Sequence, residues 1–145
     1  MYKNILLPTD GSDLSKNAVQ HGIQLAKAVK AKVTSVTIIT PSQLFMLEPE
    51  IVTETPEDYM KHMVNFASKC LDQVKAAALA EGVSCDVLYL EHDSPYEAII
   101  ETANNQHCDL IVMASHGRRG ISAIVLGSET VKVLTHSTIP VLVYR

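Results

Sequence analysis

The most constraining feature of this chain is a set of five short apolar runs, separated by segments with helical periodicity. The runs predict strands at residues 2–8, 33–40, 85–90, 109–114 and 140–144. Their nearly continuous apolar character is typical of strands buried on both faces, as in parallel sheets covered by helices. With right-handed crossovers, the alternation predicts an α/β fold with one doubly wound, five-stranded parallel sheet and four helices.

Capping residues indicate where the intervening helices begin. Ser12 is a suitable N-cap, and Thr55 precedes a proline, Pro56, at the first helical position. Ser94 with Glu97 three positions later has the spacing of a capping box, in which each side chain satisfies a backbone amide of the other residue. The predicted helices cover about 12–30, 55–82, 94–105 and 127–136, and residues 41–55 are expected to form a loop.

Length and charge exclude several classes of protein. The 145 residues match one ordinary domain, so we expect a single domain over residues 1–145. The net charge of −4 argues against nucleic-acid partners and anionic membrane surfaces, which both attract clustered cations. No apolar run is long enough to span a membrane, and Pro8 interrupts the first run too early for a signal peptide. We therefore expect a cytoplasmic protein.

Metal and common enzyme motifs are absent from the sequence. The three cysteines, Cys70, Cys85 and Cys108, form no CxxC pair, and the six histidines form neither HxxxH nor HExxH. There is also no Walker-type loop, no GxGxxG after the first strand and no GxSxG elbow. We expect no metal site within the protein itself and buried, reduced cysteines.

Two segments lie where a doubly wound sheet binds ligands, at the carboxyl ends of strands where the strand order reverses. After the fourth predicted strand, Gly117 allows close approach of a ligand to the backbone, and Arg118 supplies positive charge. The amides of Gly127, Ser128 and Glu129 open a helix and are suited to bind phosphate. The alternative, equally open, is a tight connection whose glycines serve turn geometry only.

The second segment follows the first predicted strand. Asp10 could accept hydrogen bonds from ligand hydroxyls or help to hold a divalent cation. The alternative is a carboxylate that caps the first helix. His116 lies in the loop after the fourth strand, where we expect it to pack rather than to act as a general base.

Taken together, these residues resemble the universal stress protein A family over essentially the whole chain. Three segments carry the resemblance: ILLPTDGS at 5–12, SHGRRG at 115–120 with Gly127 and Ser128, and PVLV at 140–143. The resemblance implies a Rossmann-like sheet of strand order 3-2-1-4-5. The ATP-binding subgroup has the motif Gly-x2-Gly-x9-Gly-Ser/Thr, and here Gly117, Gly127 and Ser128 match while Ala114 replaces the first glycine.

The resemblance also implies roles for individual residues. Ile38 would meet the adenine through its backbone, and Pro8, Thr9 and Asp10 would flank the adenosine. Met113 and Ala114 would line the ribose. The phosphates would be held by Gly117, Gly127, Ser128 and Glu129. The implied nucleotide-binding set is Pro8, Thr9, Asp10, Ile38, Met113, Ala114, His116, Gly117, Arg118, Gly127, Ser128 and Glu129. The phosphate contacts are expected mainly from main-chain amides, with Arg118 as a further partner.

The implied function is a nucleotide-binding stress-response or signalling module, with ATP or AMP, and Mg²⁺ in some cases, as its ligand. We expect no efficient catalysis, because no obvious general base could activate water, although slow ATP hydrolysis near Asp10 stays open. The resemblance further implies a homodimer through Val141–Tyr144 and an unidentified protein partner. The alternatives are a monomer and a dimeric interaction module that binds no nucleotide; a flavin enzyme has no specific support.

Overall fold

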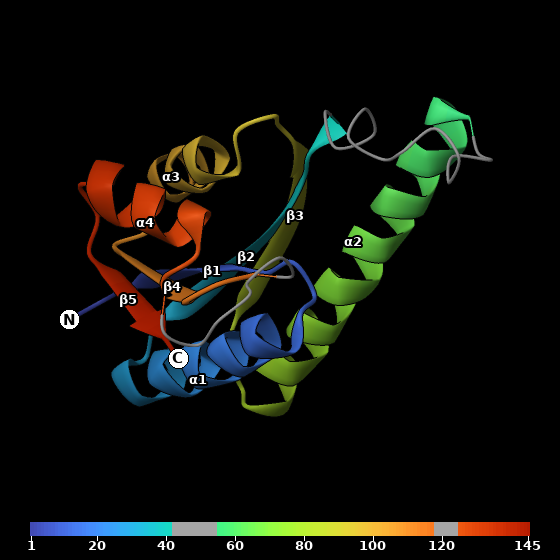
Figure 1. Cartoon of the computed structure of the whole chain (residues 1–145). Helices are drawn as coiled ribbons and strands as arrows, with labels where there is room; N and C mark the ends of the chain where they lie inside the picture. The colour runs from blue at the N-terminus through green and yellow to red at the C-terminus, as the bar shows by residue number, and fades with distance from the viewer. Residues whose placement is uncertain (42–54, 118–124) are drawn as a thin grey trace.

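A computed structural model describes residues 1–41, 55–117 and 125–145, so the predicted loop at 41–55 lies almost entirely outside the described residues. Five parallel strands form one sheet in the order β3-β2-β1-β4-β5 (Figure 1). The predicted strands and their order are thereby confirmed, with ends shifted by two residues at most. Their bounds are β1 Asn4–Pro8, β2 Lys32–Ile39, β3 Cys85–Glu91, β4 Leu110–Ala114 and β5 Val141–Tyr144.

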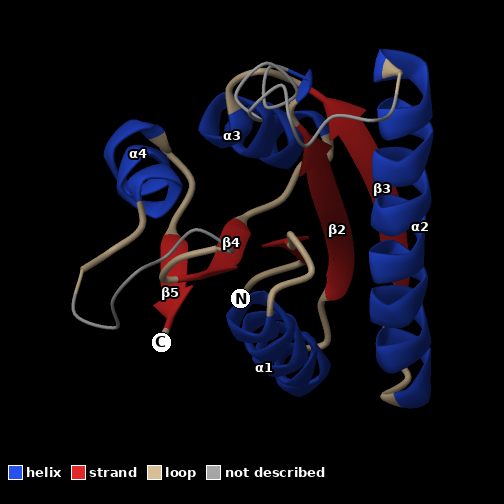
Figure 2. Cartoon of the chain, turned by 45° about the vertical axis from the view of Figure 1, so that its right-hand side comes forward, coloured by secondary structure: helices blue, strands red, loops and turns tan. Residues whose placement is uncertain are grey.

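Four helices cover the two faces of the sheet (Figure 2). The helices α1, Asp13–Val29, and α2, Pro56–Ala80, pack on one face with Ile5 and Leu7 of β1. The helices α3, Pro95–Asn105, and α4, Ser128–His136, cover the other face with Leu6. Because alternate side chains of β1 enter opposite cores, every residue of this strand's centre is apolar. No helix of the described residues is long and apolar enough to cross a membrane.

All three predicted N-cap residues precede their helices, but the capping box predicted for Ser94 and Glu97 is wrong. Ser12 Oγ accepts the Ser15 amide at 3.3 Å, and Thr55 Oγ1 accepts the Asp58 amide at 3.2 Å. Ser94 makes no side-chain cap of α3. Instead, the Tyr96 amide donates to Glu129 Oε2 of α4 at 2.9 Å, so a carboxylate distant in sequence replaces the predicted capping box.

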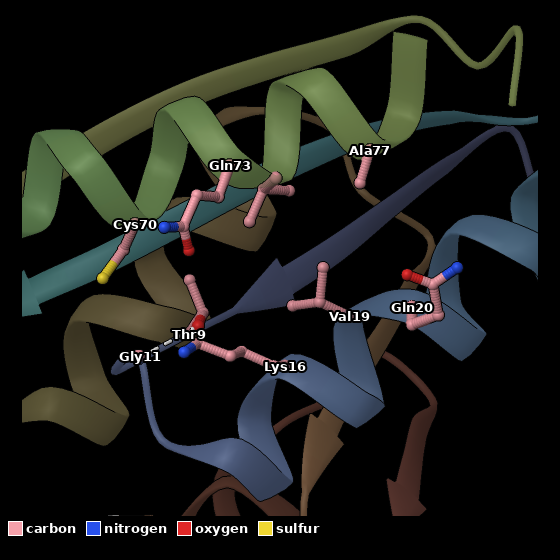
Figure 3. A pocket seen from close by; sticks show the side chains of 9 residues that line it. Thr9, Gly11, Lys16, Val19, Gln20, Cys70, Gln73 and Ala77 are labelled. Atoms are coloured by element: carbon pink, nitrogen blue, oxygen red, sulfur yellow. Dashed lines mark hydrogen bonds between the residues drawn. The ribbon is translucent and has the colours of Figure 1, made fainter. Parts of the chain in front are cut away.

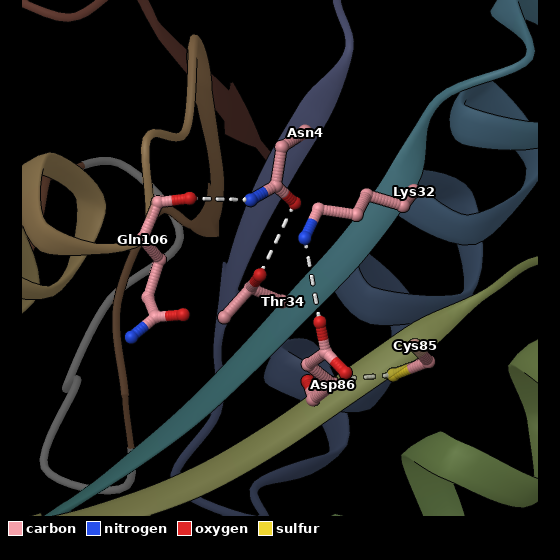
Figure 4. A network of polar contacts seen from close by, with 6 residues as sticks. All are labelled: Asn4, Lys32, Thr34, Cys85, Asp86 and Gln106. Carbon is pink, nitrogen blue, oxygen red and sulfur yellow. Dashed lines mark hydrogen bonds and ion pairs between the residues drawn. The ribbon is translucent and has the colours of Figure 1, made fainter.

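A buried polar network fixes the amino-terminal edge of the sheet (Figure 4). Asn4 is only 3% exposed. Its Nδ2 donates to the Gln106 carbonyl at 2.9 Å, and its Oδ1 accepts from Thr34 Oγ1 at 3.1 Å. Asn4 thus joins β1, β2 and the turn after α3, and buried groups of this kind are costly to leave without a partner.

The network predicts a specific pattern of stabilities. Asn4→Leu should lower the free energy of unfolding by about 2 kcal/mol, because the Thr34 hydroxyl and the Gln106 carbonyl would lose their partner. Adding Thr34→Val should cost less than it does in the wild-type background, because the hydroxyl has already lost its bond to Asn4 Oδ1. Urea unfolding of the two single variants and the double variant measures this coupling. Strictly additive effects would contradict it.

Candidate functional site

The strand order reverses between β1 and β4, at the centre of the sheet. From β1 the chain passes through α1 to β2, whereas from β4 it passes to β5 on the opposite side (Figure 1). Helices on opposite faces follow the two strands, and in doubly wound sheets this switch point is where a ligand crevice is expected. Both predicted ligand segments lie at this place.

Buried hydroxyl groups hold the turn after β1. The Thr9 amide donates to the Val36 carbonyl at 2.9 Å, and Thr37 Oγ1 donates to the Thr9 carbonyl at 3.0 Å. Thr9 Oγ1 shares a 2.5 Å hydrogen bond with Ser15 Oγ and accepts the Gly11 amide at 3.2 Å. Thr9 therefore fixes the turn with both its backbone and its side chain, which leaves its hydroxyl engaged within the protein.

Asp10 projects from this turn toward the segment after β4. One carboxylate oxygen, Oδ1, accepts the Ser12 amide at 3.0 Å, so Asp10 bonds to the residue that caps α1, while the cap itself is Ser12 Oγ. The other oxygen, Oδ2, is so close to Gly117 that a Cβ at this glycine would overlap it. Asp10 thus has a structural bond and also lies beside the glycine of the second predicted segment.

Gly127 lies against the end of β4 and leaves little room for a side chain. A Cβ there would be 3.0 Å from His116 Cα and 3.3 Å from the Ser115 carbonyl oxygen. Its amide donates to the Ser115 carbonyl at 2.7 Å, so it is not available to a ligand, contrary to the sequence-based expectation. Gly127 allows the start of α4 to lie close to Ser115 and His116. Ser128 and Glu129 supply the first amides of α4.

Ala114, which replaces the first motif glycine, causes no backbone strain. It lies within β4, is buried, and accepts a 3.0 Å hydrogen bond from Thr130 Oγ1 of α4 at its carbonyl. The described non-glycine residues with positive φ are Lys30 and His107, so Ala114 has an ordinary backbone conformation. Alanine is therefore compatible with this position.

The Glu129 side chain points away from the phosphate role that its backbone could have. Its Oε2 accepts the Tyr96 amide of α3, and its Oε1 pairs with Lys132 Nζ at 3.2 Å. Tyr96 donates its hydroxyl to Glu97, and this bond is the main reason why the pKa of Tyr96 is raised. Glu129 thus ties the start of α4 to the start of α3.

The remaining predicted residues divide into three groups. Ile38 and Met113 belong to the core beneath α3 and α4, so they could meet a ligand through the backbone or a side-chain edge. Because Pro8 pairs with Val36, Ile38 extends beyond the end of β1 and borders the crevice. His116 is half-buried, with Nδ1 3.2 Å from Ser115 Oγ. Arg118 lies outside the described residues.

Sequence reasoning missed the hydroxyl side chains that hold the two segments in place. Ser15, Thr37 and Thr130 each bond to a residue of the site, and all three are buried. The only available signal was the presence of small hydroxyl residues beside strand ends, which also occurs in ordinary turns.

The cysteines of this chain are free thiols, and two of them have raised pKa values. Each cysteine lies in the described part of the chain and none forms a disulfide; Cys70 and Cys108 are buried and Cys85 is partly exposed. Burial raises the pKa of the Cys85 and Cys108 thiols, which favours their protonated form. Within residues 1–41, 55–117 and 125–145, no three His, Cys, Asp or Glu side chains gather as a metal site.

Comparison with known proteins agrees with this geometry. A universal stress protein of Methanocaldococcus jannaschii is 34% identical over 145 residues, which cover 100% of this chain and 83% of that protein. The universal stress protein UspA from Lactobacillus plantarum has the same fold, with a TM-score of 0.84, 21% identity, and coverage of 99% of this chain and 98% of that chain. A universal stress protein in complex with cAMP matches with a TM-score of 0.71, 26% identity, and coverage of 99% and 97%.

The family model of the universal stress protein family matches residues 1–145, the whole chain. This match agrees with the strand order, the two segments at the switch point and the identity to the archaeal relative. The chain therefore belongs to the universal stress protein family.

Proposed function

We propose that this protein is a cytoplasmic stress-response module that binds an adenine nucleotide, ATP or AMP, between the turn after β1 and the segment that joins β4 to α4. The supporting observation is the pair of glycines at the switch point. A Cβ at Gly117 would overlap Asp10 Oδ2, and a Cβ at Gly127 would make a tight contact with the His116 backbone. Such close backbone approach, next to a helix N-terminus, suits phosphate binding.

Each part of the nucleotide has a matching part of the crevice in this proposal. The amides of Ser128 and Glu129, with the Ser128 hydroxyl, would hold phosphate oxygens at the start of α4. Pro8, Thr9 and Asp10 would flank the adenosine, and the half-buried Ile38 near the end of β2 would border the adenine. The relative solved with cAMP supports an adenine ligand for the family fold.

The electrostatics of Glu129 are compatible with a phosphate nearby. Its carboxylate is engaged by the first turn of α3 and by Lys132, which offsets its negative charge. The proposed role is binding, because His116 bonds to Ser115 and no described side chain is positioned as an evident base for water.

Substitution at Gly127 tests the nucleotide site. Gly127→Glu should abolish ATP and AMP binding, because the side chain adds bulk beside His116 and a negative charge where phosphate would bind. Calorimetric titration, with and without Mg²⁺, measures the loss. Ala28→Glu is the matched control, because it adds the same charge at an exposed position of α1 and should bind like the wild type.

Unfolding midpoints of both variants should be compared with that of the wild type, so that loss of binding is separated from loss of fold. Wild-type protein that is folded and ligand-free, yet gives no heat with millimolar ATP or AMP, would overturn the proposed function. The alternative, an interaction module that binds no nucleotide, would then be favoured.

A homodimer through Val141–Tyr144 is the second part of the proposal. The strand β5 is an edge of the sheet, and Leu142 on it is 42% exposed. Val131 and Leu134 of the neighbouring helix α4 are also exposed large apolar side chains. A strand edge beside exposed apolar side chains favours pairing with a second copy, and a two-fold axis would cover both edges at once.

Leu142→Lys should convert the dimer to a monomer, because two lysines would meet near the axis without a partner charge. Sedimentation equilibrium measures the mass. Leu79→Lys is the matched control, because Leu79 is 78% exposed on α2, away from β5, and should leave the dimer intact. A monomeric wild type at micromolar concentration would contradict this part of the proposal.

A further inference from the structure

A second cavity lies on the opposite face of the sheet from the phosphate-binding segment, between α1 and α2 (Figure 3). Its volume is about 170 Å³. The labelled side chains of the two helices point toward one another across it. The lining residues are Thr9, Gly11, Lys16, Val19, Gln20, Cys70, Gln73, Val74 and Ala77.

The inner wall of this cavity is apolar. Val19 of α1 and Val74 of α2 are buried members of the core on this face, and Ala77 packs against the same core. Cys70 is also buried and adds a polarisable thiol to the wall. This wall therefore favours an aliphatic group over water.

The rim carries three polar side chains, Lys16, Gln20 and Gln73, all of them on exposed residues. Lys16 extends from α1 toward Thr9 (Figure 3). In the described part of the chain, no side chain or backbone group pairs with the Lys16 ammonium, and none of the lining residues is acidic. The rim thus offers one cation and two amides that can donate hydrogen bonds.

We propose that this cavity binds a small organic carboxylate with a short aliphatic tail. The tail would lie against Val19, Val74 and Ala77, and the carboxylate would meet Lys16, with Gln20 or Gln73 as a second donor. The charge on the rim selects an anion, because an alkylammonium would face Lys16 with like charge. The apolar wall selects against small inorganic anions, which would lose hydration there without gain.

The cavity shares the turn after β1 with the nucleotide site. Thr9 and Gly11 line the cavity, while Asp10 between them faces Gly117. Gly11 has φ +79°, and a Cβ there would be 2.8 Å from both Cys70 Sγ and Phe66 Cζ, so α2 packs directly on this turn. An occupant between the helices would act on the turn, and occupancy would therefore change nucleotide affinity. This regulation rests on the proposed function; the carboxylate site itself does not.

Hexanoate is a suitable probe, with hexylammonium as a control of the same chain length. Titration of methyl- and amide-labelled protein, followed by two-dimensional NMR, should move the methyl signals of Val19, Val74 and Ala77 and the amide signal of Gly11. Hexylammonium should leave them unchanged. Absence of shifts with hexanoate in folded protein, or equal shifts with hexylammonium, would overturn the carboxylate site.

Two variants test the assigned contacts. Lys16→Met should weaken hexanoate binding about tenfold, because it removes the cation and keeps the length of the side chain. Lys75→Met removes the same charge from an exposed position of α2 that does not line the cavity, and should bind as the wild type does. Ala77→Leu should abolish binding by filling the cavity. Unchanged affinity in both Lys16→Met and Ala77→Leu would overturn the assignment.

A separate titration tests the regulation. The ATP affinity should differ between hexanoate-free and hexanoate-saturated protein, and by linkage ATP should change the hexanoate affinity by the same factor. Equal ATP affinities would overturn the regulation and leave the NMR result to decide on the cavity. If no ATP bound under either condition, the proposed function and the regulation would both fail, and the methyl shifts would still decide whether the carboxylate site exists.

Discussion

The turn at Thr9 is the constraint on which both proposed sites depend. It is bonded to β2 through Val36 and Thr37 and to α1 through Ser15, so its path is set by buried hydrogen bonds rather than by exposed contacts. A buried hydroxyl or amide without a partner costs more than the bond contributes, which makes alternative paths of this turn unfavourable. The turn consequently holds Asp10 next to Gly117 and Gly11 next to α2.

Two glycines without side chains allow other parts of the molecule to pack closely against this turn. Gly11 brings α2 against the turn, and Gly117 brings the segment after β4 against Asp10. A Cβ at either position would require side chains of the facing segment, Cys70 and Phe66 or Asp10, to move. The glycines at the edge of the sheet are therefore packing residues as much as turn residues, and this dual requirement explains why close backbone approach occurs on both sides of β1.

The sequence predicted the strands and their parallel arrangement, because continuous burial on two faces leaves a strong apolar pattern. It predicted the start of α3 but not the group that caps it, since the carboxylate comes from Glu129, more than thirty positions away. The amide of Gly127 was also misjudged, because its bond to Ser115 depends on how β4 and α4 meet. Local patterns describe local bonds, and both errors concern bonds between elements distant in sequence.

The motif positions 114 and 127 differ in how much space they leave for a side chain. At Gly127 a Cβ would be 3.0 Å from the backbone of His116, so any other residue requires that backbone to shift by a few tenths of an ångström. At position 114 the residue lies inside a strand with ordinary φ, and its interaction with α4 is made by its carbonyl, which any residue has. A departure from the motif at 114 therefore removes nothing on which the described geometry depends, whereas the same substitution at 127 would displace the start of α4.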